Sequence, residues 1–260
     1  MEIQNREIDL EGFYRQLDKS FQKLLILDYD GTLAPFHIDP SKAVPYPGII
    51  RMLNRIMKNR HVKTVIVSGR WTKDIVPLLQ LDRMPEIWGS HGLERLKEDG
   101  TYEVAEMEKR AVEGIVLSKE WIDRLGLSNR SEMKPGCLAI HWRGLNRHRI
   151  DSIKAMIEDK WSLILKGYGL EIKQFDGGME FRVPGRNKGD AVKTLLNEAG
   201  RDYVAAYLGD DMTDEDAFHG INGKGIGILV RKKWRRTAAD IWIKPPEELL
   251  EFLSHWIGDK

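Results

Sequence analysis

The stretch LILDYDGTLA at residues 25–34 places two carboxylates, Asp28 and Asp30, directly after an apolar run with the composition of a buried strand. A glycine, Gly31, then marks a turn. An ionised carboxylate resists leaving water, so two acids at the end of a buried strand are locally unfavourable. Such a cost is usually found where a cation or a reaction uses the charge. Asp28 and Asp30 are therefore candidates for metal binding or catalysis.

A second acidic cluster repeats this arrangement near the end of the chain. The sequence GDDMTDED at residues 209–216 follows the apolar run Tyr203–Leu208. Two strand ends with clustered carboxylates predict one site for a hard cation, and Mg²⁺ is the usual occupant where phosphate is the substrate.

The composition is that of an ordinary globular protein, because 42% of the 260 residues are hydrophobic, 31% are charged and the net charge is +1. A near-neutral chain has no global field for nucleic acid or membrane, so we expect neither as a partner. The single cysteine, Cys137, cannot form an internal disulfide, which favours a reducing cytoplasm. We find neither a signal-type apolar segment near the N-terminus nor an apolar run of spanning length, and we therefore expect a cytoplasmic protein.

The two ends of the chain alternate short apolar strands with helices, which predicts an α/β fold with a parallel sheet covered on both faces. Strands are expected at Leu24–Leu27, Val62–Val67, Ile87–Gly89, Val204–Leu208 and Gly225–Val230, and helices at Ile49–Lys58, Thr72–Leu79, Gly189–Ala199, Asp214–His219 and Glu247–Ile257.

The middle of the chain has a different pattern, with long helices and paired hairpins. Turns are marked by Glu98-Asp99-Gly100, by Pro135-Gly136 and by Asp176-Gly177-Gly178. We therefore predict a discontinuous catalytic core formed by residues 1–92 and 184–260. An α+β cap domain, residues 93–183, would be inserted into it and would determine substrate specificity.

The expected strand ends carry groups suited to phosphate chemistry. In open parallel sheets ligands bind at the carboxyl ends of the strands. Ser68-Gly69-Arg70 and His91 join the acids there, and Lys188 adds a cation at the start of a helix. Taken alone, Ser68 would be a helix cap and Lys188 a surface charge. Asp28 is a reasonable nucleophile because a carboxylate with a pKa of about 3.9 is ionised at neutral pH. Asp30 would protonate the leaving group and then deprotonate water.

Four motifs, Asp28–Leu33, Ser68–Arg70, Lys188-Gly189 and Gly209–Asp211, resemble those of the haloacid dehalogenase (HAD) superfamily of phosphotransferases in order and spacing. The insertion between the second and third motifs implies a Rossmann-like core with a C2-type cap, of the C2B subtype. More narrowly, the chain resembles trehalose-6-phosphate phosphatases. That narrower resemblance is carried by the sequences GSHGLE at residues 89–94, IHWR at 140–143, MEFR at 179–182 and GDDMTDEDAF at 209–218.

The resemblance implies roles for individual residues. It implies a Mg²⁺-dependent phosphatase that hydrolyses trehalose 6-phosphate in trehalose biosynthesis through an aspartyl-phosphate intermediate. Asp28 would be the nucleophile and Asp30 the general acid and base. The implied metal ligands are Asp28, Asp30 through its carbonyl, and Asp210, with Asp211 and Asp214 as supporting acids. Ser68, Gly69 and Lys188 would bind the phosphoryl group.

The cap is expected to contact the sugar through one face of its sheet. Residues 137–143 and 179–183 alternate apolar and polar side chains, which predicts an apolar face on helices and a free polar face. Given the resemblance, Arg143 and Glu180 are the leading candidates for sugar contacts. His141 and Arg182 share that polar face, and His91 and Glu94 of the core are weaker candidates.

One segment departs from the resemblance, because the basic run Arg231–Arg236 stands where relatives usually have a small neutral loop. We expect a solvated loop there. Two other functions stay open: a phosphatase or phosphomutase for another sugar phosphate, and a receiver-like signalling module with a phosphorylated Asp. A monomer is favoured.

Overall fold

The computed structural model describes residues 1–4, 8–175 and 177–258, of which 158–160 and 162–164 are described by their backbone alone. The chain forms two compact units. The first contains Met1–Glu103 and Asn187–Lys260, and the second contains Val104–Arg186. No helix among the described residues is long and apolar enough to span a bilayer.

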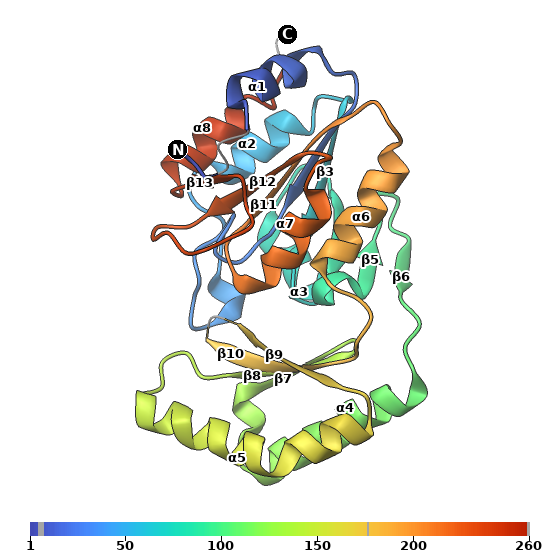
Figure 1. Cartoon of the computed structure of the whole chain (residues 1–260), viewed down its shortest axis with the longest axis vertical. Helices are drawn as coiled ribbons and strands as arrows, with labels where there is room; N and C mark the ends of the chain where they lie inside the picture. The colour runs from blue at the N-terminus through green and yellow to red at the C-terminus, as the bar shows by residue number, and fades with distance from the viewer. Residues whose placement is uncertain (5–7, 176, 259–260) are drawn as a thin grey trace. The chain divides into compact units, whose positions relative to one another are not determined.

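The first unit is built on one large sheet with the strand order β1-β13-β12-β11-β2-β3-β4-β5-β6 (Figure 1). The strands from β13 through β4 are parallel, and β1 and β5 are antiparallel to their neighbours. The strands are β1 (Glu2–Ile3), β2 (Lys23–Leu27), β3 (Val62–Val67), β4 (Glu86–Gly89), β5 (Glu94–Leu96), β6 (Tyr102–Val104), β11 (Val204–Gly209), β12 (Ile226–Val230) and β13 (Ile241–Ile243).

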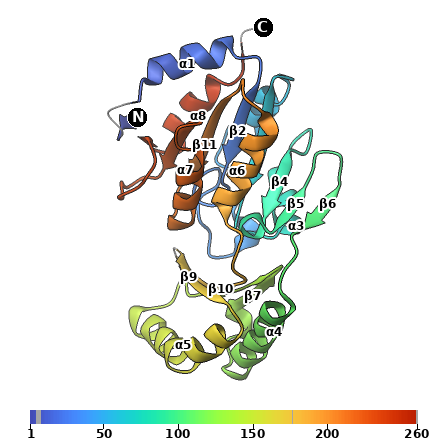
Figure 2. The same cartoon turned by 45° about the vertical axis from the view of Figure 1, so that its right-hand side comes forward.

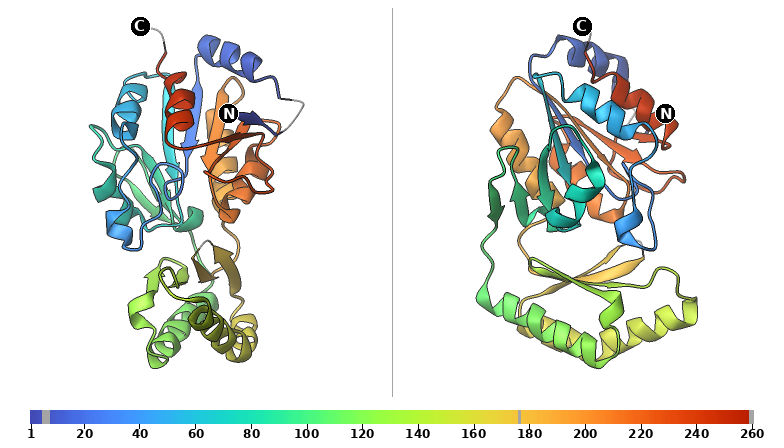
Figure 3. Two further views of the ribbon diagram at one scale, coloured as in Figure 1. Left: turned by 90° about the vertical axis from the view of Figure 1, so that its left-hand side faces the viewer. Right: turned by 180° about the vertical axis from the view of Figure 1, so that it is seen from behind.

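Helices cover both faces of this sheet, as the left panel of Figure 3 shows. One face packs against α1 (Leu10–Lys19), α2 (Ile49–Ile56), α3 (Thr72–Leu79) and α8 (Glu247–Ser254). The other face packs against α6 (Lys188–Ala199) and α7 (Glu215–Ile221). Short 3₁₀ turns lie at η1 (Pro40–Lys42), η2 (Ser90–Gly92) and η4 (Met212–Asp214).

The central strand β2 explains why the apolar runs of the sequence are nearly continuous. All five of its residues are buried. Leu25 and Leu27 belong to the core on one face, and Leu24 and Ile26 belong to the core on the other. Burial of each such side chain contributes about 1.5–3 kcal/mol. The parallel α/β fold expected from the sequence is confirmed.

The boundary between the units differs from the sequence-based expectation of residue 93. The hairpin of β5 and β6 extends the large sheet, because β5 pairs with β4 and aligns Trp88 with Arg95 (Figure 2). The open edge of β4 offers the hairpin backbone hydrogen-bond partners, which a pattern of local turns cannot reveal. The short first strand β1 was not predicted from the sequence.

The second unit is a four-stranded antiparallel sheet, with the order β7-β8-β10-β9, covered on one face by two helices (Figure 1). Its core includes the ring of Trp161 stacked on that of Phe181 at a centroid distance of 5.5 Å. Asp176, expected in the last turn, lies outside the described residues. The elements are α4 (Lys109–Arg124), η3 (Ser128–Arg130), β7 (Ser131–Lys134), β8 (Cys137–His141), α5 (Arg147–Gly167), β9 (Glu171–Phe175) and β10 (Gly178–Arg182).

Candidate active site

Three neighbouring strands bring the expected catalytic groups to one edge of the large sheet. Asp28 follows β2, Ser68 follows β3 and Asp210 follows β11. Because these strands are parallel and adjacent, their carboxyl ends meet. The backbone N–H of Asp28 donates to the carbonyl of Leu208 at 2.8 Å, which fixes the ends of β2 and β11 to each other.

Lys188 links the two acidic clusters. Its Nζ lies 2.7 Å from Oδ1 of Asp28 and 2.7 Å from Oδ1 of Asp214. All three side chains are buried. Lys188 is the first residue of α6, which begins with a capping box between Asn187 and Asp190. The cap fixes the start of the helix, so the ammonium group is held at the edge of the sheet rather than in solvent.

Asp214 supports the loop that carries Asp210. Its Oδ2 accepts hydrogen bonds from the backbone N–H groups of Asp210 and Asp211, at 3.0 and 2.9 Å. Its Oδ1 accepts from Lys188 and from the hydroxyl of Tyr207. Four donors therefore occupy the Asp214 carboxylate.

The residues present fit a divalent cation. Carboxylate oxygens of Asp28, Asp210 and Asp214 lie within 4.8 Å of one another. Oδ1 of Asp210 is buried and has no hydrogen-bond partner among the described residues. Gly31 has a φ of +81°, and a Cβ there would lie 2.1 Å from Oδ2 of Asp210, so only glycine leaves room for this carboxylate. An oxygen-rich group with one unsatisfied buried oxygen is the donor set that Mg²⁺ prefers.

The pKa values of these buried acids also indicate that their ionised forms need a nearby positive charge. Burial raises the pKa of Asp28 to about 8, against the attraction of Lys188 and with added repulsion from Asp214 and Asp30. Burial, with the nearby charge of Asp28, also raises the pKa of Asp210 well above its usual value. Burial acts to raise the pKa of Asp214 too, but Lys188 and Tyr207 hold it below its usual value. In the protein without a cation, burial therefore opposes the ionised form of Asp28 that we expected at neutral pH.

The side chain of Asp30 does not join the carboxylates of Asp28, Asp210 and Asp214, because Arg70 holds it. Nε and Nη2 of Arg70 donate to the two oxygens of Asp30 at 2.6 and 2.7 Å, and Nη1 donates to the carbonyl of Pro40. Sequence analysis named Arg70 only as part of the Ser68–Arg70 motif and gave it no role. The position of Arg70 shortly after the end of β3 was the sequence feature that could have indicated a role at this edge of the sheet.

The turn after β3 brings Ser68 and Gly69 together with His91. Oγ of Ser68 accepts from the backbone N–H of Arg70, and Ser68 does not cap α3, whose N-cap is Trp71. A Cβ at Gly69 would lie 2.5 Å from Cε1 of His91, so the imidazole lies directly against this glycine. The backbone of His91 has a φ of +58°, a conformation that is costly outside glycine and is often found at functional sites.

Glu94, expected as a weak sugar contact, is fully buried beside this strained turn. Its Oε1 accepts from the hydroxyl of Ser90, and its Oε2 accepts from Thr72 at 2.9 Å and Tyr102 at 2.8 Å. Ser90 also has a positive φ, of +47°. Because three hydroxyl groups occupy this carboxylate, its contacts favour a support for the turn over a sugar ligand.

In the second unit, the polar face of the sheet carries a row of charged side chains. Nζ of Lys134 lies 3.6 Å from Oε1 of Glu180 and 3.6 Å from Oε2 of Glu132. The Nε2 atom of His141 lies 3.0 Å from Oε2 of Glu132. Ala139 is aligned with both Glu132 and Glu180, so the two acids flank a small side chain. Sequence analysis missed Glu132 and Lys134, although the alternation of Ser131–Lys134 next to β8 contained the signal.

Two other expected sugar contacts of this unit have local partners. Nη2 of Arg182 donates to the carbonyl of Arg186 at 3.0 Å. Arg143 lies against Gly177, where a Cβ would approach its side chain to 2.5 Å. The apolar residues of the same strands, among them Leu138, Ile140 and Phe181, lie in the core under the helices, as the alternation predicted.

Comparison with known proteins identifies the family. Residues 26–241 match the family profile described as trehalose-phosphatase, which covers most of the chain. The chain belongs to the trehalose-phosphatase family. This family consists of phosphoric monoester hydrolases, and the chain is an enzyme of that class.

Individual relatives agree with this family assignment. Trehalose 6-phosphate phosphatase RA3 of Zea mays is 31% identical over 264 residues, which cover 93% of this chain and 72% of that protein. A trehalose-6-phosphate phosphatase related protein has a crystal structure with a TM-score of 0.71 and 25% identity, over 90% of this chain and 97% of that one. A haloacid dehalogenase-like hydrolase from B. subtilis matches with a TM-score of 0.61 and 14% identity, over 90% and 99% of the two chains. The expected HAD-like fold class is confirmed.

Within this trehalose-phosphatase, the basic segment Arg231–Arg236 is an exposed loop at four of its positions, as expected, but Arg231 and Arg235 are partly buried. The Arg235 side chain is 15% exposed and forms an ion pair with Glu215. The sequence did not predict this contact of Arg235, because a run of like charges carries no information about the acidic loop that lies beside it in space.

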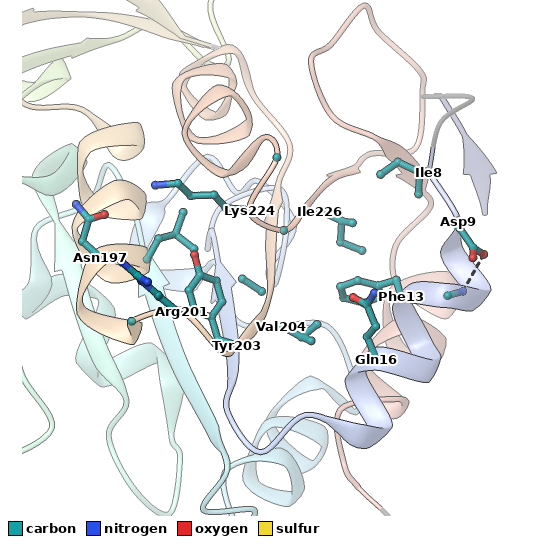
Figure 4. A pocket seen from close by; sticks show the side chains of 16 residues that line it. Ile8, Asp9, Phe13, Gln16, Asn197, Arg201, Tyr203, Val204, Lys224 and Ile226 are labelled. Carbon is teal, nitrogen blue, oxygen red and sulfur yellow. Dashed lines mark hydrogen bonds between the residues drawn. The ribbon is translucent and has the colours of Figure 1, made fainter.

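A cavity of about 590 Å³ in the trehalose-phosphatase lies beside α1 and the start of β11 (Figure 4). Phe13 of α1, Arg201, Tyr203 and Lys224 are among its lining residues. Its lining includes Val204, where β11 begins, whereas Asp210 follows the end of that strand. A strand of this length spans roughly 20 Å at 3.3 Å per residue, so the cavity is separate from the acidic cluster.

Proposed function

We propose that this enzyme hydrolyses trehalose 6-phosphate to trehalose and phosphate through phosphorylation of Asp28. The observation that carries the proposal is the buried pair of Asp28 and Lys188 beside Asp210, at the carboxyl ends of β2 and β11. The names of the relatives support trehalose 6-phosphate as the substrate.

In the first step, a carboxylate oxygen of Asp28 attacks phosphorus and the bond from phosphorus to the sugar oxygen breaks. Asp30 donates a proton to that sugar oxygen, and trehalose leaves as a neutral alcohol. Lys188 and the hydroxyl of Ser68 hold phosphoryl oxygens during the transfer. Since Arg70 donates to both oxygens of Asp30, this pairing favours the ionised carboxylate and is weakened when Asp30 carries the proton.

In the second step, Asp30 takes a proton from water while the water oxygen attacks the phosphorus of phospho-Asp28. The bond from phosphorus to the Asp28 oxygen then breaks, which releases inorganic phosphate and restores the carboxylate. A Mg²⁺ ion, held by Asp28, Asp210 and the Asp30 carbonyl, would offset the negative charge that otherwise repels the nucleophile from the phosphoryl group.

For substrate recognition we propose the polar face of the second unit, which would serve as the cap. Glu180 and Arg143 stay the leading contacts to sugar hydroxyls, and His141, Arg182 and His91 are further candidates. To these we add Lys134 and Glu132, which lie in the same charged row as Glu180. For Glu94 we propose support of the Ser90–Gly92 turn instead of a sugar contact. A monomer in the cytoplasm remains our prediction.

The proposal is tested by phosphate release from a panel of trehalose 6-phosphate, sucrose 6-phosphate and glucose 6-phosphate, each with Mg²⁺ and with EDTA. We expect release from trehalose 6-phosphate at the highest kcat/KM and none with EDTA. Preference for another sugar phosphate would overturn the substrate assignment. Full activity in EDTA would overturn the role of the cation.

A further inference from the structure

Arg235 contacts the backbone of the loop that carries Asp210. Its Nε donates to the carbonyl of Asp210 at 3.1 Å, and its Nη2 donates to the carbonyl of Asp211 at 2.6 Å. Its Nη1 donates to Glu215 and to the carbonyl of Arg236. One planar guanidinium group therefore binds two consecutive carbonyl oxygens of the acidic loop, a geometry that an ammonium group cannot reproduce.

The same two residues are held on their N–H side by Asp214. The backbone N–H groups of Asp210 and Asp211 both donate to Oδ2 of Asp214. Arg235 thus holds the carbonyls of this dipeptide, while Asp214 holds its N–H groups. Any movement of the Asp210 backbone would break at least one of these charge-assisted hydrogen bonds.

Glu215 fixes Arg235 in this position. Besides binding Arg235, Oε1 of Glu215 accepts from the hydroxyl of Thr237 at 2.8 Å, and its Oε2 accepts from the backbone N–H of Ala238 at 2.7 Å. The loop after β12 is therefore tied to the first turn of α7. Arg231 adds a weaker contact, with its Nη1 3.3 Å from the carbonyl of Asp210.

We propose that Arg235 is a positioning residue that holds Asp210 in the geometry needed to bind a divalent cation. The inference rests on the proposed function, because that function gives Asp210 its role as a metal ligand. It concerns a segment that sequence analysis left without a function. Partners that orient a metal ligand typically change metal affinity by 10–100-fold when they are removed.

The charge of Arg235 alone would have the opposite effect. A guanidinium cation near the site repels Mg²⁺, so its removal would strengthen binding if charge dominated. Loss of its hydrogen bonds would weaken binding. The sign of the change therefore separates positioning from charge.

The test is calorimetric titration of the whole protein with Mg²⁺ in the absence of substrate. Arg235→Ala and Arg235→Lys should both weaken binding by roughly 10–100-fold. The lysine variant keeps the charge but loses the planar fork. Arg236→Ala removes an exposed charge from the same loop and should bind like the unmodified protein. Unchanged or tighter binding by Arg235→Ala would overturn the inference.

Thermal unfolding in EDTA shows whether each variant folds. If Arg235→Ala does not fold, Glu215→Gln is tested in its place. Glu215→Gln keeps Arg235 but removes the charge of its ion-pair partner, so the affinity for Mg²⁺ should fall by a smaller factor. Unchanged affinity would count against the inference. With trehalose 6-phosphate, saturating Mg²⁺ should restore kcat in Arg235→Lys, which a damaged fold would not allow.

The inference and the proposed function fail in different ways. If the unmodified protein binds Mg²⁺ but releases no phosphate from trehalose 6-phosphate, the proposed function fails and the binding comparison still decides the inference. If the unmodified protein releases phosphate and Arg235→Ala binds Mg²⁺ with the same affinity as the unmodified protein, only the inference fails. Absence of Mg²⁺ binding by the unmodified protein overturns the inference and the role of the cation, whereas the substrate assignment is decided by phosphate release.

Discussion

The ammonium group of Lys188 lies 2.7 Å from a carboxylate oxygen of Asp28, although 160 residues separate the two in the sequence. The same nitrogen also binds Asp214, so one buried cation stands against three buried acids once Asp210 is included. When the three acids are ionised, the cluster has an excess of negative charge, which is the physical basis of the predictions on stability and which a divalent cation would relieve.

Asp28→Asn should abolish turnover of trehalose 6-phosphate, because an amide oxygen cannot form the phosphorylated intermediate. We expect kcat to fall at least about a thousandfold. The fold should be retained, since the change removes one charge from an over-charged cluster without changing its volume. Phosphate release and thermal unfolding in EDTA measure the two effects. Substantial turnover by this variant would contradict Asp28 as nucleophile.

The stability of the cation-free protein should fall as the pH rises from about 5 to 8. Because burial raises the pKa of Asp28 to about 8, the folded state binds a proton that the unfolded state releases near pH 4. The favourable contribution is therefore present at low pH and is lost as the pH approaches 8. The slope is at most about 1.4 kcal/mol per pH unit for one proton.

Urea unfolding in EDTA at several pH values measures this slope. The control is Asp28→Asn, which lacks the titrating group and should show a shallower dependence on pH. Mg²⁺ should flatten the dependence in the unmodified protein, because it stabilises the ionised acids. An equal slope in the protein and the variant would refute the assignment to Asp28.

Lys188→Met should destabilise the protein strongly, because it leaves buried acids without their cation. Removal of one partner from a buried ion pair costs about 3–5 kcal/mol, and we expect a loss of this size at pH 8. Protonation of the acids should reduce the loss at pH 5. Urea unfolding of Lys193→Met, an exposed lysine of the same helix, provides the comparison. Equal effects of the two substitutions would show that the Lys188 pair is not important for stability.

Much of this site could be predicted because it depends on where strands end. The apolar run before Asp28 and the one before Asp210 each indicate a buried strand, and parallel strands place their carboxyl ends at one edge. The family resemblance predicts Asp214 as a supporting acid. The sequence did not predict the four donors to its carboxylate, because they come from separate elements. These donors are Lys188, Tyr207 and two backbone N–H groups.

The failures have a common physical cause, which is pairing over long sequence distances. The β5–β6 hairpin could have belonged to either unit, and only the free edge of β4 decided its place. The basic run at Arg231–Arg236 has the composition of a solvated loop, yet Arg235 is bound to carbonyls of the loop after β11. The pKa of Asp28 likewise depends on burial that a local sequence does not report.

Asp30→Asn should slow the second chemical step more than the first when the leaving group needs no proton. With p-nitrophenyl phosphate, we expect a burst of nitrophenol followed by turnover reduced by about 10²–10⁴-fold. Mass spectrometry of the quenched protein should show one added phosphoryl group. Asp39→Asn, a more exposed carboxylate in the same loop, should behave like the unmodified protein. Without a burst or a phosphorylated species, Asp30 would not be the base of the second step.

Glu180→Gln should impair recognition of the sugar without impairing phosphoryl transfer. Glu180 and Lys134 are buried partners on the polar face of the second unit, and a lost hydrogen bond from such a group costs about 1–3 kcal/mol. We therefore expect kcat/KM for trehalose 6-phosphate to fall roughly 10–100-fold, mainly through KM. Hydrolysis of p-nitrophenyl phosphate, which has no sugar, should be unchanged. Glu120→Gln, an exposed acid on α4, should affect neither substrate. If Glu180→Gln lowered both activities equally, the residue would act on the fold or the chemistry and not on substrate choice.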